Sequence, residues 1–210
     1  MSIQLNPPTR YSTSSPPSSS AAGPSITWLT STPWTVTHST LSMWRTARNV
    51  RISYKALPPK SPGGRARLDD LVEYEPVKSD GVRKTVEGVD TQAGVDDDGG
   101  GGGEQKDSCA SWDWRGKRWL SFVSSHWEVL GWGEKEMVGG GVERWAVTWF
   151  APTLFTKEGL DIYCDRREGL SEETYQSLRE AFKALGVPKL VAMVDEDMRP
   201  VEIRLPWVEG

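Results

Sequence analysis

Short runs of alternating apolar and polar residues, separated by turn residues, recur along this chain from residue 26 onward. The run 33–39 places Trp34, Val36 and His38 on one face, and the run 49–55 alternates in the same way. Because side chains of an extended strand point alternately to its two faces, this period of two predicts half-buried β-strands. Further strands are expected at 68–74, 83–90, 111–114, 118–131, 142–150 and 160–164.

One helix is expected after these strands, over residues 171–186. Ser171 is a typical N-cap residue and two acidic residues follow it, where they favour the helix dipole. Apolar residues then repeat at helical spacing, and Gly186 and Pro188 end the helix. A further short strand is expected at 190–194.

Eight short antiparallel strands favour closure into a barrel, because closure removes exposed sheet edges. We therefore expect an all-β fold with one C-terminal helix, in which an eight-stranded antiparallel up-and-down barrel has room for side chains or one small ligand. The predicted organisation is a disordered Ser/Pro-rich tail over 1–25, the barrel with its helix over 26–198, and a C-terminal extension over 199–210 that trails off. The acidic, glycine-rich insert 94–107 is interpreted as a flexible surface loop.

Charge and composition exclude several classes of function. The formal net charge is −4 without a basic face, so nucleic acid is not an expected partner. No apolar run is long enough to predict a transmembrane segment, and the polar N-terminus does not resemble a secretory signal, so a cytoplasmic location is expected. Cys109 and Cys164 lack the spacing of a zinc or thioredoxin motif and are expected to be free thiols; no metal site or cofactor is predicted.

The order of elements and several residues resemble the lipocalins of the calycin superfamily, closest to the bacterial and apolipoprotein D-like branch. Family members open the first strand with a Gly-x-Trp motif, and Trp34 stands in that place, although Pro33 precedes it and the glycine is absent. Family members also carry an arginine between the last strand and the helix, as Arg166 does here. The resemblance spans about residues 26–194 and implies a calycin barrel. A fatty-acid-binding-protein or nitrobindin-type barrel is the alternative.

In such a barrel Trp34 would plug the closed end, with the Arg166 guanidinium over the indole face in a cation–π contact. We expect a structural role for this pair rather than a role in binding ligand.

The interior of the barrel is the expected binding site. His38 shares the face of Trp34 and is expected inside, two residues above it, while Trp44 lies in a loop that lipocalins place over the open end. The 11 tryptophans indicate either a packed β core or an aromatic-lined pocket. The predicted ligand-binding residues are His38, Trp44, Tyr54, His126, Trp127, Trp145 and Trp149.

Three functions are compatible with this pattern. The first is binding of a small apolar molecule, such as a lipid or an apolar metabolite, without chemistry. The second is an enzyme on the same barrel (an isomerase, cyclase or hydrolase) with His38 as general acid or base, assisted by Tyr54 or His126. The third is a scaffold with a filled barrel. A serine hydrolase at 124–128 is not favoured, because adjacent strand residues face opposite ways and a Gly-x-Ser-x-Gly motif is absent. The sequence does not indicate the oligomeric state.

Overall fold

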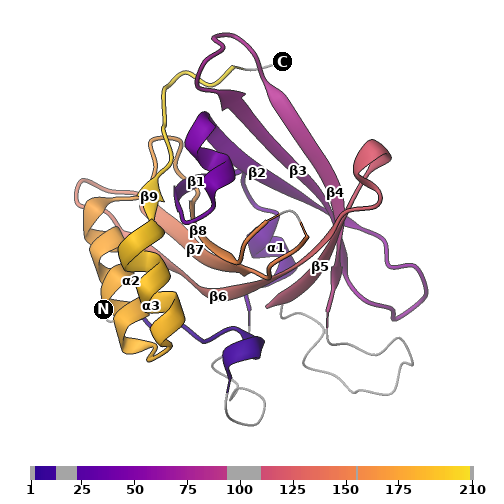
Figure 1. Cartoon of the computed structure of the whole chain (residues 1–210), viewed down its shortest axis with the longest axis horizontal. Helices are drawn as coiled ribbons and strands as arrows, with labels where there is room; N and C mark the ends of the chain where they lie inside the picture. The colour runs from indigo at the N-terminus through magenta and orange to yellow at the C-terminus, as the bar shows by residue number, and fades with distance from the viewer. Residues whose placement is uncertain (1–2, 13–22, 94–109, 155, 209–210) are drawn as a thin grey trace.

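The computed structural model describes residues 3–12, 23–93, 110–154 and 156–208 (Figure 1). Eight antiparallel strands follow one another around a ring, and β1 pairs with both β8 and β2, which closes it. The predicted eight-stranded antiparallel up-and-down barrel is therefore confirmed. The glycine-rich insert 94–107 lies outside the described residues. The strands are β1 (Trp34–Ser39), β2 (Ala47–Leu57), β3 (Arg67–Pro76), β4 (Lys84–Gln92), β5 (Ser111–Gly116), β6 (Ser124–Glu136), β7 (Val142–Phe150) and β8 (Gly159–Cys164).

The strand predicted at 118–131 begins later than expected. Residues Arg118–Leu120 form a short 3-10 helix, η5, and the strand itself starts at Ser124. The connection folds back onto Gly116, where a Cβ atom would lie 2.5 Å from the carbonyl oxygen of Leu120. The missing side chain at Gly116 therefore makes room for this tight connection.

One end of the barrel is closed by α1 (Ile26–Leu29) and the tryptophan that opens β1. The Trp34 side chain is fully buried and its Nε1 donates a hydrogen bond to the carbonyl oxygen of Leu29 at 2.8 Å. The Trp28 ring packs on it, with 4.5 Å between ring centroids. Arg166 does not fill the expected place over Trp34; its guanidinium pairs instead with Glu143 at 3.3 Å. The aromatic neighbour of the plug is thus another tryptophan.

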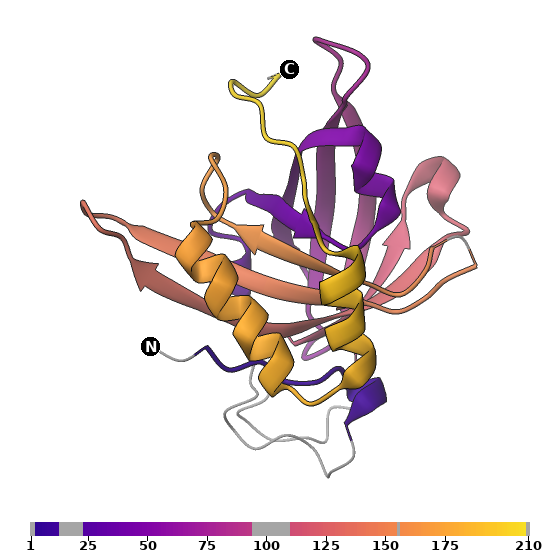
Figure 2. The ribbon, with the colours of Figure 1, turned by 60° about the vertical axis from the view of Figure 1, so that its left-hand side comes forward.

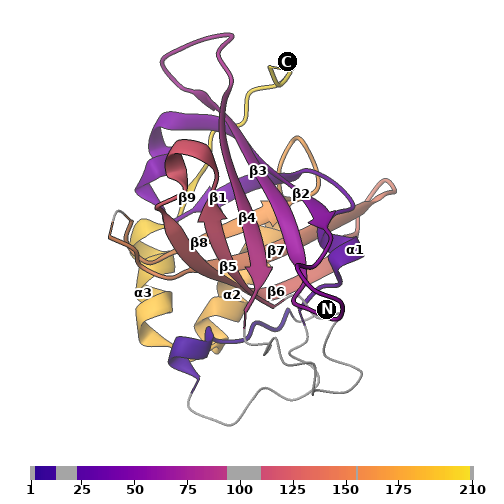
Figure 3. The same ribbon diagram turned by 90° about the vertical axis from the view of Figure 1, so that its right-hand side faces the viewer.

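Two helices, α2 (Glu172–Ala184) and α3 (Pro188–Asp197), cover the outer face of β6, β7 and β8 (Figure 2). The predicted cap is confirmed, because the Ser171 side chain accepts a hydrogen bond from the backbone N–H of Thr174. The strand expected at 190–194 is wrong: these residues belong to α3. Proline is favourable in the first turn of a helix, so Pro188 starts a new helix as well as ending the previous one. The wall formed by β2 to β5 lies away from these helices (Figure 3).

A buried carboxylate on β7 fixes the start of α2. Glu143 accepts hydrogen bonds from the backbone N–H of Ser171 at 2.7 Å, the Ser171 hydroxyl at 2.7 Å and the Thr174 hydroxyl at 2.6 Å. Arg166 supplies the opposite charge. These partners satisfy the buried carboxylate, which would otherwise be costly to desolvate.

Part of the predicted N-terminal tail is packed against the barrel. Leu5 is buried with the outward-facing residues of the wall, and the backbone N–H of Asn6 donates to the carbonyl oxygen of Leu130 at 2.7 Å. A Cβ atom at Gly131 would lie 2.5 Å from Cδ2 of Leu5, so glycine makes the close approach possible. The prediction of disorder over 1–25 is therefore wrong for residues 3–12, because their few apolar side chains find a matching surface. Residues 13–22 lie outside the described part.

The C-terminal extension completes the barrel wall instead of trailing off. β1 and β2 pair directly at Trp34–Ile52 and Thr35–Arg51, toward the closed end. Farther along, the chain after α3 runs between them: β9 (Arg199–Pro200) pairs with β1, and Glu202 forms a parallel bridge with Arg48 of β2. We call this junction of β1, residues 199–204 and β2 the seam.

Asn49 holds the seam from the side of β2. Its backbone has a φ of 51°, a left-handed conformation that asparagine tolerates better than most residues. Its Nδ2 donates to Glu75 at 2.9 Å and to the carbonyl oxygen of Arg204 at 2.7 Å, and its Oδ1 accepts from the backbone N–H of Arg204 at 2.7 Å. Beyond this point the Trp207 ring lies under the guanidinium of Arg51, at 4.8 Å from its centroid.

We expect Asn49→Ala to destabilise the protein by about 2 to 4 kcal/mol, because it removes three hydrogen bonds at a buried position. Urea unfolding monitored by tryptophan fluorescence measures the change. Asn49→Gly removes the same bonds but relieves the backbone strain, so it should be less destabilising by about 1 kcal/mol. An alanine variant as stable as the original chain would contradict this role of Asn49.

Candidate binding site

A cavity of about 310 Å³ lies inside the barrel, toward the end opposite α1. Its open side is covered in part by η3 (Ser42–Thr46), the 3-10 helix in the connection between β1 and β2. Met43 and Trp119 border the opening, which we call the mouth, and remain 48% and 76% exposed. Trp44, in the same 3-10 helix, also lines this cavity.

Aromatic rings form most of the cavity wall. The Tyr54 and Trp127 rings lie nearly parallel, with 5.9 Å between their centroids, and Trp112 stacks behind Trp127 at 6.0 Å. Inward-facing strand side chains supply much of the remaining surface, among them Ile52, Val72, Val86 and Phe150. Val123, just before β6, also contributes.

Trp114 owes its position in the wall to a glycine on the neighbouring strand. A Cβ atom at Gly88 would lie 2.0 Å from Nε1 of Trp114, so the indole occupies the space of the missing side chain. Gly88 pairs with Asp70 in the β3–β4 register. The indole of Trp114 therefore reaches across β4 and hydrogen-bonds the Asp70 carboxyl.

Three buried aspartates lie on the inner face of the barrel, and each accepts a hydrogen bond from an indole N–H. Trp114 bonds Asp70, Trp127 bonds Asp90 at 2.8 Å, and Trp44 bonds Asp161 at 3.2 Å. The hydroxyl of Ser39 also donates to Asp161. Within the described part of the chain, Oδ1 of Asp70 and Oδ2 of Asp90 have no hydrogen-bond partner.

Burial changes the acidity of these groups. Desolvation raises the pKa of Asp90 to about 7 and the pKa of Asp161 to about 6. The pKa of Asp70 is raised well above its ordinary value by burial and then by the neighbouring Asp90. Burial therefore favours the protonated form of the Asp70 carboxyl in the empty cavity.

Three of the predicted ligand-binding residues, Trp44, Tyr54 and Trp127, line the cavity. His38 does not. A register shift between Val36 and His38 interrupts the alternation of β1, so His38 points outward and stacks on Tyr175 of α2 at 3.8 Å between centroids. Burial under the helix lowers the pKa of His38 to about 4. The expected interior position of His38 is therefore wrong.

Trp145 and Trp149 also lie outside the cavity. Both faces of β7 are apolar, and these two residues belong to the face that packs beneath α2 and α3. Nε1 of Trp149 donates to Glu158 at 2.7 Å, in the connection before β8. The inward face of β7 is the other one, and Phe150 represents it in the cavity wall.

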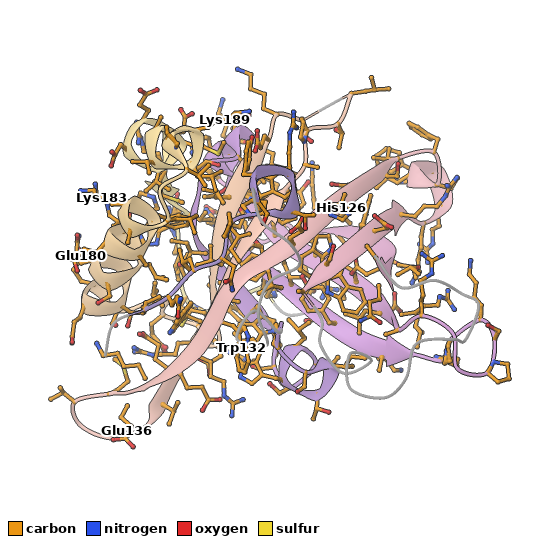
Figure 4. All side chains as sticks on the ribbon, turned by 90° about the horizontal axis from the view of Figure 1, so that it is seen from below. His126, Trp132, Glu136, Glu180, Lys183 and Lys189 are labelled. Carbon is orange, nitrogen blue, oxygen red and sulfur yellow. The ribbon has the colours of Figure 1, made fainter. Side chains whose placement is uncertain are left out.

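His126 lies on the outer face of β6 (Figure 4). Its Nδ1 is 2.8 Å from Asp113 and its Nε2 is 3.3 Å from Glu128. The hydrogen bond with Glu128 raises the pKa of His126, although burial opposes it. This cluster joins the N-terminal segment to the wall, because Glu128 also accepts hydrogen bonds from Thr9. His126 thus has a place on the surface and not in the cavity.

Other surface features and residue types do not point to a competing site. A larger hollow of about 790 Å³ lies outside the barrel between η3 and α3, and charged residues such as Lys157 and Asp197 line it. Cys164 is buried in β8 and is a free thiol, and burial raises its pKa to about 12. Cys109 lies outside the described residues.

In the described ranges no three side chains are arranged to hold a metal ion, and no helix is long and apolar enough to cross a membrane.

The sequence analysis missed Asp70, Asp90, Asp161 and Trp114. Alternation gives a signal for the first of these, since Asp70 falls on the same strand face as Leu68 and Val72. A carboxyl on an apolar strand face is a candidate for a buried functional group.

Comparison with solved structures finds apocrustacyanins among the similar chains. Lobster apocrustacyanin A1 matches with a TM-score of 0.42 and 10% identity, over 82% of this chain and 77% of that chain. Apocrustacyanin C1 matches with a TM-score of 0.44 and 13% identity, over 87% of this chain and 77% of that chain. No family model and no curated protein matches the sequence. Because these likenesses are weak, the barrel assignment rests on the strand pairing described above.

We expect Asp90→Asn to make stability less dependent on pH. The folded pKa of Asp90, about 7, exceeds its ordinary value of 3.8, so its contribution to stability is complete below about pH 4 and is lost as the pH rises toward 7. The loss is at most about 1.4 kcal/mol per pH unit for one proton. Asparagine keeps an oxygen for the Trp127 indole, so the variant should gain stability relative to the original chain between pH 4.5 and pH 7.5.

Urea unfolding at pH 4.5, 6 and 7.5 measures this difference. Asp195→Asn serves as the control, because Asp195 lies on the outside of α3 in an ion pair with Arg179 and is largely accessible to solvent. An Asp90→Asn curve parallel to that of the original chain would show that Asp90 is not protonated on folding.

Proposed function

We propose that this protein binds one small, largely apolar molecule inside its barrel. The observation that carries the proposal is the aromatic cavity of about 310 Å³, which Trp34 and α1 close at one end and which opens at the mouth. Ligand pockets in proteins are typically concave and lined by apolar and aromatic side chains with a few polar groups. A lipid fragment or an apolar metabolite with a ring system fits a cavity of this size and lining.

The mouth supports the same proposal. Trp119 and Met43 are exposed at the rim and also line the cavity, so a ligand can pass from the surface to the interior over continuous apolar side chains. The apolar surface of a ligand leaves water as it enters along this path, and that transfer is favourable. The resemblance of the first and last strands to bacterial and apolipoprotein D-like lipocalins agrees with a carrier.

Binding is favoured over the enzyme that the sequence left open. That alternative required His38 inside the barrel, and His38 instead stacks on Tyr175 outside the wall. The scaffold alternative required a filled barrel, whereas this barrel is filled at the α1 end only.

We expect Val86→Phe to weaken binding of the neutral fluorescent probe N-phenyl-1-naphthylamine by at least about tenfold, or about 1.4 kcal/mol. Val86 is half-buried on the inner face of β4, opposite Val72 of β3, and a larger ring there occupies cavity volume. Probe emission and quenching of tryptophan fluorescence measure the dissociation constant.

Val89→Phe is the matched control, because Val89 lies on the same strand with the opposite parity and is also half-buried. It should bind the probe like the original chain. If both variants bind equally well, the probe does not occupy the barrel. If the original chain does not bind the probe or quench with other apolar ligands, the proposed function fails.

A further inference from the structure

The cavity wall contains a carboxyl oxygen that the described part of the chain leaves without a hydrogen-bond partner. Asp70 is only 7% exposed and lines the cavity, and its Oδ1 has no hydrogen-bond partner in the described part of the chain. Asp90, at 0% exposed, lies behind it on the next strand and also has an oxygen without a partner. Buried polar atoms are nearly always hydrogen-bonded, so an unpartnered carboxyl oxygen in the cavity wall points to a group supplied from outside the chain.

Among the described residues, none forms an ion pair with Asp70 or Asp90. Lys117 acts on Asp70 only as a minor electrostatic influence, because it pairs with Asp69 on the other face of β3. A buried pair of acids without a cation is costly, and an apolar side chain in place of Asp70 would avoid that cost. A neutral apolar ligand would leave this cost uncompensated.

The surrounding rings favour the same chemistry. Trp114 and Trp127 donate their indole N–H groups to the two carboxyls, while Trp44 and Tyr54 complete the wall around Asp70. The face of an aromatic ring attracts cations, most strongly for tryptophan and when water is excluded. A carboxyl surrounded by indole and phenol rings is therefore suited to a positively charged nitrogen attached to an apolar body.

We propose that the ligand of this cavity is an apolar amine, whose protonated nitrogen donates a hydrogen bond to Oδ1 of Asp70 while its apolar part contacts the aromatic wall. This inference rests on the proposed function and specifies the class of molecule that is bound. The carboxyl transfers its proton to solvent as the ammonium group arrives, which leaves a carboxylate–ammonium pair in the cavity. No other bond forms or breaks.

Calorimetry with two probes of nearly equal shape tests the inference. 1-Naphthylmethylamine is protonated at neutral pH, and 1-naphthalenemethanol is its neutral counterpart. The original chain should bind the amine at least tenfold more tightly than the alcohol at pH 7.5. Asp70→Asn should abolish this preference with less than a threefold change for the alcohol, because asparagine has the same shape and still accepts the Trp114 indole bond. Asp195→Asn, on the outside of α3, should keep the preference.

Proton release gives a second readout on the unmodified protein, so the test does not depend on how the variant folds. Binding of the amine in buffers of different ionisation enthalpy should release up to one proton, and binding of the alcohol none. The titratable groups that influence Asp70 electrostatically are Asp90 on β4, Asp69 on the outer face of β3, Tyr54 on β2, Tyr163 on β8 and Lys117 after β5. In Asp90→Asn the residue at position 90 cannot lose a proton. Proton release that persists in this variant therefore comes from Asp70, and release that disappears comes from Asp90.

The outcomes distinguish the two proposals. If N-phenyl-1-naphthylamine and the alcohol bind but the amine binds no more tightly, the barrel is a carrier of neutral molecules and the amine proposal is overturned. The same conclusion follows if Asp70→Asn keeps the preference for the amine. If none of the three probes binds, both proposals fail together.

Discussion

The closure of β1 against β2 is the constraint on which the rest of this structure depends. β1 is six residues long, and its direct pairing with β2 covers only its first two positions. An unpaired edge inside a barrel wall would leave backbone donors and acceptors without partners and would open the interior to water. Residues 199–204 supply the missing partners, and Asn49 fixes them to β2 through its left-handed backbone and three side-chain hydrogen bonds. The barrel wall is continuous on this side because residues 199–204 fill the seam.

The wall that the seam completes separates two apolar cores of different character. The inner one holds the plug and the aromatic cavity, and the outer one holds α2, α3 and the N-terminal segment. Tryptophans on both sides of the wall donate the indole N–H to a hydrogen-bond partner. For example, Trp34 donates to a backbone carbonyl at the closed end, Trp127 donates to a carboxyl inside the barrel, and Trp149 donates to a carboxyl outside it. Indole is large and apolar but needs one polar partner, so acidic residues accompany the tryptophans on both sides of the wall.

Alternation along the sequence predicted the strands well and the direction of their side chains less well. Alternation of apolar and polar residues is a property of each strand by itself. The bounds of β1 to β8 were therefore predicted to within a few residues, except at the start of β6. Alternation does not determine which face is inside when both are apolar, as on β7, and it fails after a bulge, as at His38. The seam and the packing of Leu5 depend on contacts between residues more than 100 positions apart, which local patterns do not encode. Asp70 was accessible to the same reasoning that found Trp127, but a charged residue on an apolar face was not interpreted as buried.

The position of η3 links the mouth to the seam. Arg45 of this short helix donates to the carbonyl oxygen of Ser39, the last residue of β1, and to that of Asp197, the last residue of α3. Its neighbour Trp44 faces the cavity and bonds Asp161. Arg45 therefore ties the covering of the cavity to the start of the C-terminal segment. A displacement of η3 that widened the mouth would have to break these hydrogen bonds at the point from which residues 199–204 depart, so entry of a ligand and closure of the barrel wall depend on the same arginine.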